Sequence, residues 1–353
     1  MDERIKKSAE ILVNHSARVK KGELVQIMGS TLTEPLALEI YKQVLQKGGQ
    51  PILRLAPEKA GKIFYDYAKK HQLDYYPKHE EELSKKTAAF IYLGGDENTR
   101  HLSNVNPDKM SHRMKIMNPI RDIRLTKKWV IFEYPTNALA QEADMSLDEF
   151  EDFVYGAVIQ DWSKQKNFQE KVIKRIGKSK VMHVKSPDTD ITMNVDGRKW
   201  MLSYGRFNMP SGEVFTSPIE SSVEGYIKYD FPGIYSGKEV TGIELEFENG
   251  KVKKATATKN ESLLKKLIAM DKGSDKLGEL GIGTNFGIQK FVKNILFDEK
   301  IGGTCHLALG DSFKDAKGTN KSALHWDMIK DLRKGGFIKA DNKIIQKNGK
   351  FIF

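Results

Sequence analysis

Along the first 180 residues, apolar positions recur with helical spacing in some segments and as short strand-like runs in others. Between residues 2 and 20 they return every three to four positions, which predicts an amphipathic helix. A short apolar run at residues 23–28 predicts a strand. A helix is then expected over residues 33–47, because a hydroxyl cap and a first-turn proline favour its start and a glycine pair favours its end.

Further strand signals are separated by segments long enough for helices, and they lie at residues 51–55, 88–93 and 129–132. A later helix is predicted to begin at Ser146, because Ser146 and Glu149 form the pattern of a capping box. Strands joined by helix-length connections indicate a mostly parallel sheet with helices on its faces. The loop after the first strand lacks the glycine spacing of a dinucleotide-binding loop. We therefore predict an α/β N-terminal domain over residues 1–180 without a cofactor.

The second half has a different pattern of short strands and tight turns. Residues 190–195 alternate between apolar and polar as a strand does. Asn-Gly pairs at residues 249–250 and 348–349 each separate two strand-like segments. Because Asn-Gly tolerates the positive φ angles of a tight turn, both places predict β-hairpins. We predict a β-rich α+β C-terminal domain over residues 181–353.

The composition is that of a globular protein, with 39% hydrophobic and 30% charged residues and a formal charge of +11. Only 11 of the 58 basic residues are arginine, and the lysines are spread along the chain among acids. This distribution favours a solvated surface over a nucleic-acid-binding face, so a basic nucleic-acid-binding protein is the less favoured alternative. No apolar run approaches the roughly 20 residues of a membrane span. A single cysteine and an N-terminus without a signal-peptide core predict a cytoplasmic protein.

Acidic and histidine residues gather in four short motifs of the second half. These motifs are Asn208–Thr216 with Glu213, Lys276–Gly281 with Glu279, Ile295–Gly310 with Glu299 and His306, and Ser322–Ile329 with His325 and Asp327. If residues 324–329 form a strand, its period of two places His325 and Asp327 on the same face, where both can bind one cation.

The charge of these residues favours a metal centre. The four carboxylates contribute a charge of about −4 when ionised, which two divalent cations would balance. Carboxylates with a minority of histidines suit zinc, cobalt or manganese. Two such ions about 3.5–4 Å apart can activate a water and polarise a carbonyl together.

Each motif also has a purely structural interpretation. A histidine in an apolar segment is often a hydrogen-bonded core residue, and a Gly-Glu pair is often part of a turn. Cys305 beside His306 raises the alternative of a thiol nucleophile. Adjacent residues of a strand point to opposite faces, so that pairing is disfavoured.

Taken together, the motifs resemble the aminopeptidase T family of metallopeptidases, peptidase family M29. The resemblance rests on Asn208–Thr216, Leu277-Gly278-Glu279, Leu296–Gly310 and His325-Trp326-Asp327, and it extends to Gly29–Pro35, Tyr134–Thr136 and Ala140–Leu147. It implies an N-terminal α/β domain, a C-terminal catalytic domain, a homodimer and two divalent metals. It further implies removal of N-terminal residues from peptides with a free N-terminus.

Carried over position by position, the resemblance assigns the metal ligands as Glu213, Glu279, Glu299, His306, His325 and Asp327, with Glu279 also in a catalytic role. The spacing from Glu299 to His306 is longer here than in some relatives. One further departure is Phe313, where relatives often have a tyrosine seven residues after the equivalent of His306. Because phenylalanine can neither ligate a metal nor donate a hydrogen bond, a metal-binding protein with lost or altered hydrolysis is an alternative.

Overall fold

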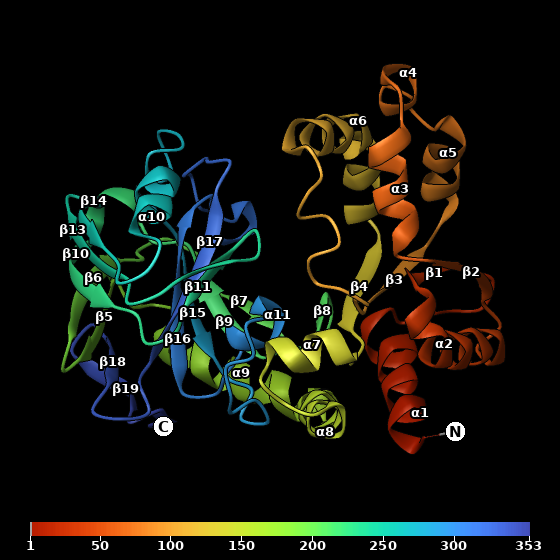
Figure 1. Cartoon of the computed structure of the whole chain (residues 1–353). Helices are drawn as coiled ribbons and strands as arrows, with labels where there is room; N and C mark the ends of the chain where they lie inside the picture. Colours follow the sequence, from red (N-terminus) through yellow and green to blue (C-terminus); the bar gives the residue numbers. More distant parts are fainter. Residues whose placement is uncertain (1) are drawn as a thin grey trace. The chain divides into compact units, whose positions relative to one another are not determined.

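The computed structural model describes residues 2–353, which form two compact units (Figure 1). The first unit comprises the residues up to Gln160 together with Gly205–Pro210. The second comprises Asp161–Tyr204 and Ser211–Phe353. The division falls before helix α9, whereas the sequence predicts a domain boundary near residue 180.

The first unit is built on a parallel sheet with strand order β2-β1-β3-β4-β8, as its pattern of strands and helices predicts. The strands are β1 Leu24–Ser30, β2 Gln50–Ala56, β3 Ala89–Gly94, β4 Lys128–Glu133 and β8 Asn208–Met209. In β3, the adjacent residues Phe90 and Ile91 are both fully buried. Because neighbouring side chains point to opposite faces, both faces of this central strand are covered.

Three helices of the first unit, α1, α2 and α8, begin where the sequence signals place them. They are α1 Glu3–Glu10, α2 Glu34–Gln46, α3 Lys59–Tyr67, α4 Lys70–Leu73, α5 Lys78–Lys86, α6 Pro107–Leu125, α7 Asn137–Glu142 and α8 Leu147–Val158. A π-helical segment, Ile11–Ser16, continues α1, so the predicted first helix is present in two parts. The capping box at α8 is confirmed: the Glu149 backbone N–H donates to Ser146 Oγ at 3.3 Å, and the Ser146 backbone N–H donates to Glu149 Oε2 at 2.9 Å.

The second unit contains an eight-stranded and a five-stranded sheet, with orders β14-β13-β10-β6-β5-β18-β19-β20 and β17-β16-β15-β9-β7, and a two-stranded ribbon β11-β12. Its strand pairs are antiparallel, which confirms the β-rich prediction. The eight-stranded sheet consists of β5 Val181–Ser186, β6 Thr189–Asn194, β10 Glu224–Lys228, β13 Glu244–Glu248, β14 Lys251–Thr256, β18 Phe337–Ala340, β19 Lys343–Lys347 and β20 Lys350–Phe351. The remaining strands are β7 Met201–Ser203, β9 Glu213–Thr216, β11 Gly233–Tyr235, β12 Lys238–Val240, β15 Leu277–Gly283, β16 Thr304–Gly310 and β17 His325–Asp331, and the helices are α9 Trp162–Ile176, α10 Glu261–Ile268 and α11 Ile295–Asp298.

Both predicted hairpins are present in the eight-stranded sheet. Asn249 and Gly250 join β13 to β14 with φ angles of 54° and 78°. Asn348 and Gly349 join β19 to β20 with φ angles of 50° and 72°. These positive angles are the reason why the Asn-Gly signal is specific.

One apolar core joins the two large sheets of the second unit. The five-stranded sheet contributes alternate residues, which are Val214, Leu280, Ile282, Cys305, Leu307, Leu309, Trp326 and Met328. The residues between them therefore point to the other face of this sheet. Among residues 2–353, no helix combines the length and the apolar character required to cross a bilayer.

Candidate metal centre

Four neighbouring strands position five of the six predicted ligands on one face of the five-stranded sheet. Glu213 begins β9, Glu279 lies in β15, His306 in β16, and His325 and Asp327 in β17. The pairing register places Ala308 of β16 opposite both Glu279 and Asp327. The small alanine side chain between them leaves room in front of the sheet.

Glycine at position 281 is required by the geometry of this face. Gly281 of β15 pairs directly with His306 of β16. A Cβ atom at Gly281 would lie 2.0 Å from both Cε1 and Nε2 of the His306 ring. Because glycine has no side chain, the imidazole of His306 can occupy the space that a Cβ atom at position 281 would fill.

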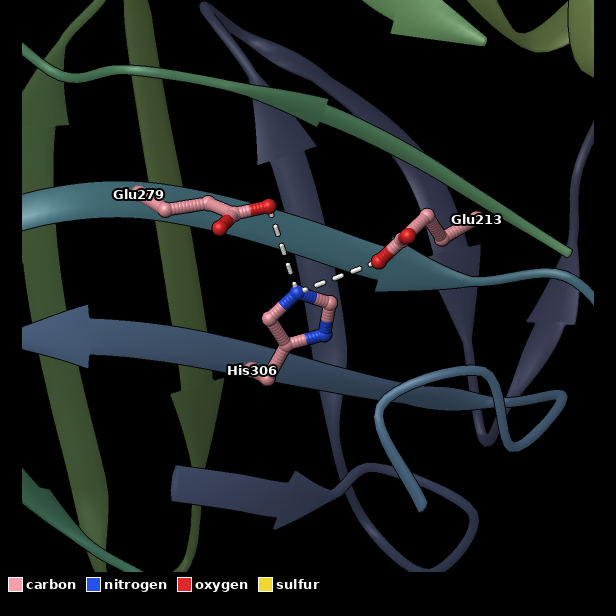
Figure 2. A group of neighbouring side chains, drawn as sticks. All are labelled: Glu213, Glu279 and His306. Carbon is pink, nitrogen blue, oxygen red and sulfur yellow. Dashed lines mark ion pairs between the residues drawn. The ribbon is translucent and has the colours of Figure 1, made fainter. Parts of the chain in front are cut away.

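His306 is the centre of the first ligand group (Figure 2). Its Nε2 lies 3.3 Å from Glu213 Oε2 and 3.5 Å from Glu279 Oε1. Figure 2 shows both carboxylates directed at the same ring nitrogen, Glu279 from the upper left and Glu213 from the right. All three residues are buried, and their ligand atoms lie within 4.8 Å of one another.

Glu279, His325 and Asp327 form a second group. His325 Nε2 lies 3.3 Å from Glu279 Oε2 and 3.4 Å from Asp327 Oδ2. Its other ring nitrogen, Nδ1, lies 2.9 Å from the backbone carbonyl oxygen of Asp311. An Nδ1–H that donates to this carbonyl fixes the tautomer and leaves Nε2 free to act as a ligand.

Glu299 completes a third group with His306 and Asp327. It follows helix α11 rather than lying on a strand, and its side chain is 15% exposed. All six residues named from the sequence are therefore brought together. Three of them, Glu279, His306 and Asp327, each belong to two of the three groups.

Several buried ligand atoms lack a hydrogen-bond partner among residues 2–353. They are Glu213 Oε2, Asp327 Oδ1 and both ring nitrogens of His306. Buried polar atoms are normally satisfied, so a set of unsatisfied carboxylate and imidazole atoms that face one another fits a bound cation. Oxygen donors with two imidazoles suit divalent zinc, cobalt or manganese.

The groups also perturb one another electrostatically. Burial alone would raise the pKa of Glu279, but the neighbouring imidazoles of His306 and His325 hold it below its usual value. Burial opposes protonation of His325, yet Asp327 and Glu279 raise its pKa. The site therefore stabilises positive charge at the place where a cation would bind.

Sequence reasoning missed one member of this cluster. Lys300 is fully buried, and its Nζ lies 3.3 Å from Glu213 Oε1 and forms an ion pair with Glu299. The only sequence signal is a lysine directly after a predicted ligand, which is a common pattern in a chain this rich in lysine.

The acid before Glu299 has a different role. Asp298 is buried, and its Oδ1 accepts a hydrogen bond from the Val292 backbone N–H at 2.7 Å. Burial raises the pKa of Asp298 to about 8. Asp298 belongs to none of the three ligand groups found among residues 2–353.

Phe313 lies beside the second ligand group. The centroid of its ring is 5.2 Å from that of His325 and 5.0 Å from that of Phe215. The side chain is 39% exposed, so it forms part of the accessible edge of the centre.

A small cavity adjoins His325 and Asp327. Its volume is about 140 Å³. Most of its lining is apolar, and the apolar lining residues are Pro232, Ile234, Tyr235, Phe291, Ile295, Trp326 and Ile329. The cavity therefore offers an apolar environment directly beside two of the candidate ligands.

The sequence of this chain is similar to those of known peptidases. The profile of the family described as thermophilic metalloprotease (M29) matches residues 1–351. Aminopeptidase AmpS of Bacillus subtilis (strain 168) is 26% identical over an alignment of 403 positions, which covers 98% of this chain and 97% of the relative. Aminopeptidase T of Thermus aquaticus is 31% identical over 175 residues, 42% of each chain.

The fold also matches a solved structure, that of wild-type AmpT from Thermus thermophilus. The TM-score is 0.87, with 20% sequence identity and coverage of 99% of both chains. The family match over nearly the whole sequence shows that this chain belongs to the M29 family of metalloproteases and is a metal-dependent peptidase.

Proposed function

We propose that this enzyme removes the N-terminal residue from peptides with a free N-terminus, and that two divalent cations take part. The proposed ligands are Glu213, Glu279, Glu299, His306, His325 and Asp327. The observation that carries the proposal is the overlap of the three ligand groups, because shared ligands are expected where two ions lie close together. When bound, such a pair supplies an activated water and polarises the scissile carbonyl.

Glu279 has the central position in this proposal. Its Oε1 faces His306 and its Oε2 faces His325, so one carboxylate spans both halves of the centre. If two cations bind, Glu279 would contribute one carboxylate oxygen to each half of the centre. A carboxylate of the same cluster takes the proton of the attacking water and passes it to the leaving amine.

Hydrogen bonding at the site supports a substrate with a free amino terminus. Four carboxylates surround the centre, and a carboxylate oxygen can accept a hydrogen bond from an N-terminal amine. The curated relatives AmpS and aminopeptidase T are named as aminopeptidases. Both points support removal of single N-terminal residues over cleavage within a chain.

The cavity beside His325 supports a preference among N-terminal side chains. Its volume of about 140 Å³ is below that of typical small-molecule sites, which suits one side chain rather than a longer segment. Most of its lining is apolar and its acidic lining residues are Asp298 and Asp327, so an acidic side chain would be disfavoured there, because burial of an unpaired charge is costly. We propose that leucine, methionine and phenylalanine are preferred over aspartate and glutamate.

The quaternary state and the cellular address are further proposals. We propose a homodimer, on the family resemblance, and a cytoplasmic location. The single cysteine, Cys305, is buried and unpaired, which fits a reducing compartment. Light scattering coupled to size-exclusion chromatography would test the dimer, and a mass of one chain would contradict it.

One assay tests the proposed activity. Protein stripped of metal is resupplied with zinc, cobalt or manganese, and release of free amino acids is measured from Xaa-amides and short peptides. We expect release only with metal, only from free N-termini, and fastest for apolar first residues. Equal cleavage of acetylated peptides would contradict an aminopeptidase. Two bound metals per chain without turnover would favour the alternative of a non-catalytic family member.

A further inference from the structure

A buried ammonium group lies inside the candidate metal centre. The Lys300 side chain has 0% exposure, and its Nζ contacts two proposed ligands, Glu213 and Glu299. The chain itself therefore places an ammonium group where divalent cations are proposed to bind. A lysine is seldom fully buried unless its charge is paired, so these two carboxylates account for its position.

The two ion pairs of Lys300 lie on one side of the centre, and its effect on Asp327 is a weaker one without an ion pair. Glu213 and Glu299 belong to the two ligand groups that contain His306. The remaining group consists of Glu279, His325 and Asp327, and among residues 2–353 Lys300 forms no ion pair with any of these three. The ammonium group of Lys300 therefore repels a divalent cation more strongly near His306 than near His325.

We infer that Lys300 is a built-in cation that weakens metal binding on the His306 side, so that the two metals bind with unequal affinity. This inference rests on the proposed two-metal function. Like charges repel over short distances, and the repulsion is strong where water is excluded. Metal is therefore held more tightly by Glu279, His325 and Asp327, and the metal on the His306 side exchanges more readily.

Lys300 also has a role before any metal binds. Four carboxylates near one another repel, and the ammonium offsets part of this repulsion in the metal-free protein. Removing it should therefore have two opposite effects: lower stability without metal and tighter binding of metal. If the lysine had only a structural role, its removal would lower both the stability of the protein and its affinity for metal.

The chain provides a matched control in Lys330. Its side chain is 2% exposed, and its Nζ lies 2.7 Å from Asp188 Oδ1 and 3.1 Å from Asp230 Oδ2. It lies on β17, where the alternation of the strand places it on the face opposite His325 and Asp327. Its replacement by methionine removes the same charge from a buried ion pair that contains no proposed ligand.

The test compares Lys300→Met and Lys330→Met in the full-length chain. Zinc content per chain and the chelator concentration that removes each zinc are measured, together with the melting temperature of the metal-free protein. Both variants are expected to melt at a lower temperature without metal. Only in Lys300→Met is the affinity for the more weakly bound zinc expected to rise, by about tenfold or more.

The outcomes separate the inference from the function on which it rests. If Lys300→Met binds its second zinc with unchanged or lower affinity, the inference is wrong even though the wild type binds two metals. If the wild type binds fewer than two, the two-metal proposal fails and the inference fails with it. Should metal-free Lys300→Met not fold, the chelator titration is begun from zinc-loaded protein and repeated with Lys300→Gln.

Discussion

The two faces of the five-stranded sheet come from the same strands and are used in opposite ways. On β16, Cys305 and Leu307 point into the apolar core, whereas His306 between them points to the candidate metal centre. All three are fully buried, so burial does not distinguish the faces. The difference is that the core face is satisfied by packing, while polar atoms on the other face lack partners.

This comparison separates two kinds of constraint on the sequence. The core face requires volume and apolar character, and a change there should lower the free energy of unfolding. The ligand face requires particular donor atoms with space between them, which Gly281 and Ala308 provide. A change there should lower metal binding and activity more than stability. Substitutions on the two faces can test whether stability and activity respond separately.

The largest effect is expected for Glu279→Gln on the ligand face. The amide keeps the shape of the side chain but removes the negative charge shared by two ligand groups. We expect kcat/KM to fall about a thousandfold or more, as losses of essential acid–base and ligand groups do. The variant should still unfold cooperatively in a thermal melt.

Ser203→Ala is a suitable companion to this variant. Ser203 lies opposite Glu213 at the start of β9 and is outside the ligand groups found among residues 2–353. It should keep activity close to that of the wild type. If Glu279→Gln kept wild-type activity, Glu279 would not be part of the catalytic centre.

Leu307→Ala is the corresponding change on the core face. Leu307 is fully buried in the core, and its replacement leaves a cavity. We expect a loss of about 2–5 kcal/mol in the free energy of unfolding, measured by denaturant titration. Below its melting temperature the zinc-loaded variant should keep kcat/KM within about twofold of the wild type. A large fall in kcat/KM without loss of stability would show that the two faces are not independent.

The sequence predicted the regular parts of this arrangement well. The parallel sheet followed from strands separated by helices, and the hairpins followed from Asn249-Gly250 and Asn348-Gly349. These signals are local, so they need no knowledge of long-range contacts. The grouping of the six polar residues came from a resemblance among ordered motifs, since single motifs had structural interpretations as well.

Other features depend on contacts that local patterns do not contain. A turn was one interpretation of Gly278-Glu279, yet both residues lie within strand β15. Glycine lowers strand propensity, and only the pairing of Gly281 with His306 explains why it is placed there. Lys300 was missed for the same reason, because its partner Glu213 is distant in sequence.

Phe313→Tyr should increase kcat, by a smaller factor than the loss expected for Glu279→Gln. A hydroxyl added beside His325 would give the ligand face a donor for the oxyanion that develops on the scissile carbonyl. One such donor in an optimised site accounts for about 10²–10³ in kcat, so we expect a gain of about tenfold here. Phe215→Tyr is the control, since its ring contacts Phe313. An equal gain from both variants, or none from Phe313→Tyr, would contradict this role.

The smallest effect is expected for Cys305→Ala, which tests whether adjacent residues of β16 really serve different faces. Cys305 is fully buried on the core face, and burial raises the pKa of its thiol to about 12. A raised thiol pKa means that the neutral form dominates at pH 7–8, and the neutral thiol is a poor nucleophile. We expect kcat/KM within about twofold of the wild type and about 1 kcal/mol lower stability, the usual size for a small core change. Iodoacetamide should modify the wild-type cysteine only after unfolding, which mass spectrometry can follow. Loss of activity in Cys305→Ala at unchanged stability would instead favour a thiol nucleophile. The two faces of β16 would then not have separate functions.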